Sequence, residues 1–89
     1  MLEPNPKIPP HMMGAIKRYV ENGIRPGGFL TAVFANDLME AFGRADHKNI
    51  NLMFEYTSYV YNEVPGNCHG SYDIVEAWIE KGGMNGRSS

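Results

Sequence analysis

The chain has 89 residues, of which 43% are hydrophobic and 20% are charged, a composition typical of one small globular domain. Its formal net charge of −2 excludes the uniformly basic surface of a protein that binds duplex DNA. A single cysteine, Cys68, excludes an internal disulfide framework and a cysteine-rich zinc module. No apolar run reaches the length of about 20 residues that a membrane span needs, and no signal peptide is evident. We therefore expect a cytoplasmic protein.

The N-terminal half is predicted to contain an extended leader and two helices. Prolines recur through residues 1–9 and interrupt helical hydrogen bonding there, whereas Pro10 suits a first helical turn. A first helix is expected from Pro10 to Asn22-Gly23, a typical helix end, and a second over residues 26–45. The residues expected on the buried sides of these helices are Met12 or Met13, Ile16, Val20, Ile24, Leu30, Val33, Phe34, Leu38, Ala41 and Phe42.

The C-terminal half is predicted to contain two more helices. Asp46 is a suitable N-cap for a helix over residues 46–64, which ends before Pro65-Gly66. Ser71 is a suitable N-cap for the last helix, which ends at Gly82-Gly83. The residues expected on the buried sides are Ile50, Met53, Phe54, Thr57, Val60, Tyr61, Val64, Ile74, Val75, Trp78 and Ile79.

These elements predict an all-α fold. We expect a four-helix domain with short loops over residues 10–82, preceded by the leader at residues 1–9 and followed by a disordered tail at residues 83–89. A helical core of this size is barely sufficient for a lone chain, so we also expect a homo-oligomer.

Two blocks of the sequence carry a family resemblance. They are IRPGGFLTAVFANDLMEAFGRAD at residues 24–46 and SYVYNEVPGNCHGSYDIVEAWIEKGG at residues 58–83. The chain resembles, over residues 8–81, small uncharacterised proteins encoded by tailed phages and prophages. In those proteins a helix, a Pro-Gly-Gly or Pro-Gly-Ser turn, a helix ending in Gly-Arg-Ala-Asp, a Tyr-Asn helix and a Trp helix follow in that order. The resemblance implies a mobile-element origin and a helical fold, and it brings no established activity. This chain has CHGS where an aromatic residue is expected before Gly-Ser.

The segment Arg25-Pro26-Gly27-Gly28 opens the second predicted helix and allows two interpretations. Free backbone N–H groups, two glycines and the Arg25 guanidinium are suited to an anion such as phosphate. The same residues also suit a tight turn between helices, and the segment lacks the Lys-Ser/Thr of a P-loop.

Polar residues next to the apolar stripe of the second predicted helix form another candidate. Asn36 and Asp37 are poor helix formers in the middle of that helix, so we expect compensating contacts. Glu40 and Arg44 have the spacing of an ion pair, and Asp37 lies one heptad from Arg44. A network of Asp37, Arg44 and a tyrosine of the third helix would either set helix register or contact a polar ligand or partner.

The tyrosines of the third predicted helix cannot all face the core. Tyr56 and Tyr59 lie three residues apart near one face, whereas Tyr61 joins the apolar side. Exposed tyrosines mark interfaces and stack on nucleobases, although half-buried rings with hydrated hydroxyls fit the same pattern.

Residue types that support catalysis or metal binding are not arranged at recognised spacings. His11, His47 and His69 are distant in sequence and form no HExxH pair, while Cys68 and His69 are adjacent and point apart in most backbones. We expect no metal, no cofactor and no enzymatic activity.

Two functional hypotheses remain. The first is a non-catalytic, phage-type accessory protein that sequesters a small anionic, nucleotide-derived ligand, such as a host immune signal. Its ligand-binding residues would be Arg25, Gly27, Gly28, Asn36, Asp37, Arg44, Tyr56 and Tyr59. The alternative is a helical protein-protein interaction module that inhibits or adapts a host or phage protein. Met39, which lies beside the apolar stripe, and the tyrosines would then be its anchors.

Overall fold

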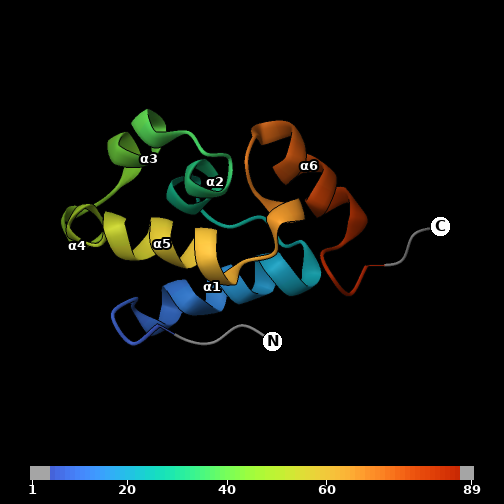
Figure 1. The fold of residues 1–89 in the computed structure, drawn as a ribbon, viewed down its shortest axis with the longest axis horizontal. Coiled ribbons are helices and arrows are strands. Elements are labelled where there is room, and N and C mark those ends of the chain that lie inside the picture. The colour runs from blue at the N-terminus through green and yellow to red at the C-terminus, as the bar shows by residue number, and fades with distance from the viewer. Residues whose placement is uncertain (1–4, 87–89) are drawn as a thin grey trace.

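A computed structural model describes residues 5–86 of the chain (Figure 1). Its elements are α1 (Pro10–Asn22), α2 (Gly28–Phe34), α3 (Leu38–Arg44), α4 (His47–Asn51), α5 (Met53–Glu63), the 3-10 helix η1 (Gly66–Cys68) and α6 (Tyr72–Lys81). This part of the chain contains no strand, so the all-α prediction is confirmed, although the prediction of four helices is wrong. The predicted leader and tail lie partly outside the described residues, which begin at residue 5 and end at residue 86.

The helix predicted over residues 26–45 is divided into α2 and α3. Asn36 adopts a left-handed conformation with a φ of 61°, which asparagine tolerates better than most residues. Asp37 then caps α3 by accepting a hydrogen bond from the Glu40 N–H at 3.2 Å. The poor helix formers in the middle of the predicted helix therefore end one helix and begin the next. The break turns Leu38 and Phe42 towards solvent, so their predicted burial is wrong.

The helix predicted over residues 46–64 is also divided, at Leu52. Asp46 caps α4 as predicted, by accepting a hydrogen bond from the Asn49 N–H at 2.8 Å. The buried positions Asn49, Met53, Tyr56 and Val60 follow one another at spacings of three and four residues, so one buried face continues across the break. This face differs from the predicted one. Among the residues predicted to be buried, Ile50, Phe54, Thr57 and Tyr61 are exposed, whereas Met53, Val60 and Val64 are buried.

Tyr19, near the end of α1, lies at the centre of the core. It is fully buried, and its ring stacks on Phe34 with the centroids 4.3 Å apart. Its hydroxyl donates a hydrogen bond to the Cys68 carbonyl at 2.6 Å, and its own carbonyl accepts one from Trp78 Nε1 at 3.0 Å. These contacts join α1 to α2, η1 and α6.

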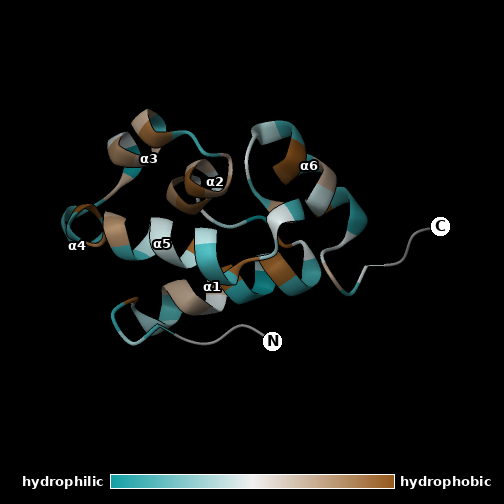
Figure 2. Ribbon diagram, viewed as in Figure 1, coloured by the Kyte–Doolittle hydropathy of each residue, from teal (hydrophilic) through white to brown (hydrophobic). Residues whose placement is uncertain are grey.

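Helix α2 is the most continuously apolar element and lies between α3, α5 and α6 (Figure 2). Its residues from Phe29 to Phe34 are buried except for Thr31, which is half-buried. Residues of α2 also line the hollows described below: Gly28 and Thr31 line one, and Val33 lines another. Within residues 5–86, no helix has the length and apolar composition that a membrane-spanning helix requires.

Residues after α6 return to the end of α1. Gly23 and Gly82 both adopt left-handed conformations and cap α1 and α6 as predicted, while Ile24, predicted to be buried, is exposed. The backbone N–H of Met84 donates to the Val20 carbonyl at 3.0 Å, and that of Asn85 donates to the Glu21 carbonyl at 2.8 Å. The described start of the tail is thus hydrogen-bonded to α1.

This contact predicts a strong effect of a methyl group at Gly83. Its φ is 74°, and an added Cβ would lie 2.6 Å from the backbone nitrogen of Asn22. Gly83→Ala should therefore lower the free energy of unfolding by about 2 kcal/mol, measured by urea denaturation with circular dichroism. Gly43→Ala is the control, since nothing lies within 4 Å of its added Cβ. In this helical position alanine should stabilise the fold by up to about 1 kcal/mol. Equal stabilities of the two variants would contradict the close packing of the tail.

Candidate functional site

Three hollows border α2, and the smallest, of about 30 Å³, has Asn36 and Asp37 in its lining. The two larger hollows also contain parts of the predicted site. The first, the arginine pocket, has a volume of about 260 Å³ and is lined by Arg25, Pro26, Gly28, Thr31, Glu40, Arg44 and Tyr72. The second, the α5 pocket, has a volume of about 470 Å³ and is lined by Val33, Asn36, Phe54, Thr57, Ser58, Val60, Tyr61, Asn62 and His69.

The arginine pocket brings together three of the residues predicted to hold phosphate. Arg25 precedes α2 and Arg44 ends α3, so the fold of α3 back onto α2 places both side chains at the same end of α2. The Arg44 side chain lies over Gly28, where an added Cβ would come within 2.9 Å of a guanidinium nitrogen. Gly27 is exposed beside them, with open space around its Cα.

Both arginines of this pocket have carboxylate partners. One Arg25 nitrogen lies 2.6 Å from each carboxylate oxygen of Glu76 on α6, and Arg44 Nε donates to Glu40 at 2.5 Å. These four side chains carry no net charge. Each pair is about half exposed, so it contributes only about 0–1 kcal/mol to stability.

The predicted network around Asp37 exists with different partners. The tyrosine is Tyr72 of α6, which donates its hydroxyl hydrogen to Asp37 Oδ2 at 2.7 Å, and not a tyrosine of residues 46–64. Arg44 bonds to Glu40 and makes no bond to Asp37 among the described residues. The hydrogen bond from Tyr72, followed by that from the Glu40 N–H, lowers the pKa of Asp37 below its ordinary value. This network joins the start of α3 to α6.

Tyr56 and Tyr59 are buried in the core, and neither lines any of these hollows. Tyr61, which was predicted to lie on the apolar side, is instead the exposed tyrosine of this helix. Tyr56 donates its hydroxyl hydrogen to the buried Asn49 side chain at 2.7 Å and packs edge-on against Phe29. Burial raises the pKa of Tyr56 to about 12. Neither ring is therefore accessible for stacking on a nucleobase in this conformation.

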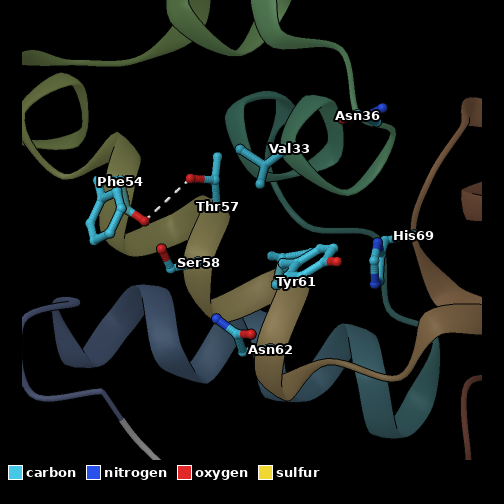
Figure 3. A pocket seen from close by; sticks show the side chains of 9 residues that line it. Val33, Asn36, Phe54, Thr57, Ser58, Tyr61, Asn62 and His69 are labelled. Carbon is cyan, nitrogen blue, oxygen red and sulfur yellow. Dashed lines mark hydrogen bonds between the residues drawn. The ribbon is translucent and has the colours of Figure 1, made fainter.

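The α5 pocket lies between α2, α5 and the segment that precedes α6 (Figure 3). Asn36 lies at its rim, apart from the arginine pocket. Figure 3 shows Tyr61 extending towards His69 at one end and Phe54 at the other, with Thr57 and Ser58 between them. None of the residues that line it is Asp, Glu, Lys or Arg. Sequence reasoning missed this pocket because it placed Phe54 and Tyr61 in the core.

Cys68 and His69 have different environments. Cys68 is fully buried, its Sγ lies 3.1 Å from the Pro65 carbonyl oxygen, and burial raises its pKa to about 12. The thiol is therefore protonated at neutral pH and is not an activated nucleophile. Within the described range, no three His, Cys, Asp or Glu side chains are grouped closely enough to hold a metal ion.

Comparisons of the chain with protein families, with curated proteins and with solved structures give no match. The resemblance to phage proteins therefore stays a prediction, and the functional argument rests on the geometry of this chain.

The contact between Tyr72 and Asp37 predicts a shift in an acid titration. A lowered pKa means that ionised Asp37 stabilises the fold above its ordinary pKa of 3.8, and that this contribution is lost as pH falls through the lowered value. Tyr72→Phe removes the hydrogen bond that is the largest cause, so the pKa of Asp37 should rise. Carboxyl NMR titration measures this change. Tyr61→Phe is the matched control and should leave the titration unchanged; an identical Asp37 titration in Tyr72→Phe would refute the assignment.

Proposed function

We propose that this chain is a non-catalytic binding protein that docks on another protein through α3. The observation that supports this proposal is the exposure of three large apolar side chains on a helix of seven residues. Leu38 is 56% exposed, Met39 83% and Phe42 43%, whereas Ala41 is the buried residue of α3. Burying such side chains contributes about 1.5–3 kcal/mol each when they leave water completely. Exposed apolar groups gathered on one element are typical of a protein-interaction site.

The ends of α3 favour this helix in the absence of a partner. Asp37 caps its N-terminus and the Glu40–Arg44 ion pair lies along it, so part of the entropic cost of ordering the helix is met before binding. Leu38 and Phe42 lie one turn apart with Met39 beside them, a spacing suited to anchors that enter an apolar groove. The proposed partner is therefore a protein with an apolar groove. The phage resemblance favours a host or phage protein in the bacterial cytoplasm.

Substitution of Met39 tests this proposal. Met39→Asp introduces a charge into the apolar contact, yet an acid in the first turn of a helix is favourable, so the fold should remain intact. Proteins are first captured from a bacterial lysate with the wild-type chain and purified. These proteins should bind the wild-type chain and fail to bind the Met39→Asp variant. Met84→Asp is the control, because Met84 is 57% exposed and lies after α6, near the end of α1. Equal binding of the captured proteins by both variants, with unchanged helicity, would argue against α3 as the docking surface.

A second candidate function is the capture of a small anionic, nucleotide-derived ligand, such as a host immune signal, at the arginine pocket. The convergence of Arg25, Gly28 and Arg44 supports it. Glu76 occupies one nitrogen of Arg25 and Glu40 occupies Nε of Arg44, so a phosphate would use the remaining guanidinium N–H groups or compete with these carboxylates. Tyr72, which lines the same pocket and is partly exposed, is the ring available to contact a base in place of Tyr56 and Tyr59.

Calorimetry tests this candidate with inorganic phosphate, cyclic nucleotides and ADP-ribose. If the pocket binds one of these anions, Arg44→Gln should raise the dissociation constant at least about tenfold, since a hydrogen bond to a charged group contributes about 1.5–3 kcal/mol. Lys48→Gln, at an exposed position of α4, removes the same charge elsewhere and should bind normally. Absence of binding by the folded wild-type chain across these anions, or equal binding by Arg44→Gln, would reject anion capture at this pocket.

A further inference from the structure

We infer that two copies of this chain associate through the exposed face of α5, with the two α5 helices antiparallel. The face consists of Phe54, Thr57, Ser58 and Tyr61, which share one side of the helix at spacings of three and four residues. It belongs to a different helix from the proposed α3 contact, so the inference goes beyond that function.

The α5 face has large residues at its ends and small ones at its centre. Phe54 is 75% exposed and Tyr61 82% exposed. They are seven positions apart, which is about two helical turns or about 10.5 Å. Thr57 and Ser58 lie between the rings, and the α5 pocket includes the hollow above these small side chains (Figure 3). The α5 face therefore carries two exposed rings and, between them, part of the α5 pocket.

This arrangement is self-complementary in one orientation. A two-fold axis between residues 57 and 58 brings residues that are equally distant from it on opposite sides face to face. Phe54 of one copy then lies against the partner's Tyr61, and the reverse pair forms at the other end. The small residues at the centre let the helices approach closely. A parallel arrangement would instead place each ring against its own equivalent.

The chemistry of the pocket also suits an identical surface. Its lining contains no charged side chain of Asp, Glu, Lys or Arg, and the net charge of each copy is only −2, so two copies repel each other weakly. The side chains of Ser58, Asn62 and His69 make no hydrogen bond to another residue in the described range. A hydroxyl group both donates and accepts, so Ser58, which lies next to the axis, can pair with the same residue of the second copy.

The area available is appropriate for a small dimer. An aromatic side chain buries about 150–250 Å². Phe54 and Tyr61 are already partly buried, being 75% and 82% exposed, so four rings across the axis supply at most about 450–800 Å². This is roughly half of the 1,200 Å² or so that marks the lower end of stable interfaces. The neighbouring pocket residues would supply the remainder.

Sedimentation equilibrium of the full chain tests the association. The wild-type chain should show a monomer–dimer equilibrium. Phe54→Ala and Tyr61→Ala should each raise the dimer dissociation constant at least about tenfold, and Ser58→Arg should raise it further by placing like charges at the axis. Met84→Ala is the control and should dimerise as the wild type does. A wild-type chain that stays monomeric through the high micromolar range, or a dimer unaffected by these substitutions, would overturn the inference.

Cross-linking tests the antiparallel register. Chains with Phe54→Cys are mixed with chains with Tyr61→Cys and oxidised, while the native Cys68 stays buried in both. Mixed disulfides should form in preference to either symmetric product. Predominant symmetric products would overturn the antiparallel arrangement. A monomeric chain that still captures its partner through Met39 would overturn the dimer while leaving the α3 proposal standing, so the two failures are distinguishable.

Discussion

Tyr19 is the residue on which the arrangement of the helices depends. Its hydroxyl and carbonyl lie in the core, where an unpaired polar group costs about 1–3 kcal/mol. The hydroxyl is satisfied by the Cys68 carbonyl at its observed position. The Tyr19 carbonyl accepts from the Gly23 N–H at the end of α1 and also from the Trp78 indole, whose buried N–H finds its partner there. Stacking on Phe34 adds α2 to the same centre. Since Cys68 and Trp78 lie 49 and 59 residues from Tyr19, these contacts fix how the C-terminal third of the chain returns to α1.

This core leaves several apolar side chains outside. Helices α1, α2 and α6 and the inner face of α5 fill the interior, and no buried side-chain polar atom of the described residues lacks a partner. The large apolar side chains left exposed include Leu38, Met39, Phe54 and Tyr61. The two larger hollows also differ in electrostatics: the arginine pocket contains balanced charges, whereas the α5 pocket is uncharged. They suit different kinds of contact.

The candidate site was predictable only where it depended on local sequence. Arg25, Gly28 and Arg44 were predicted as parts of one ligand site, but in one continuous helix Arg25 and Arg44 would lie at opposite ends. The break after α2 folds α3 back onto α2 and brings the three residues together. The partner of Arg25 is Glu76, 51 residues away, and no spacing in the sequence indicates that pair. The α5 pocket was missed because Phe54 was assigned to the core.

The sequence by itself determined the helical class and the ends of several helices. Caps such as Asp46, Ser71 and Gly23 act on backbone groups within a few residues, so local chemistry is sufficient to locate them. Only the tertiary structure decided which face of α5 is buried. Tyr56 and Tyr61 have the same hydropathy, so the sequence pattern alone does not show which of them is buried. A buried tyrosine needs a hydrogen-bond partner for its hydroxyl. Tyr56 finds that partner in Asn49 across the break at Leu52, and Tyr61 is left in solvent.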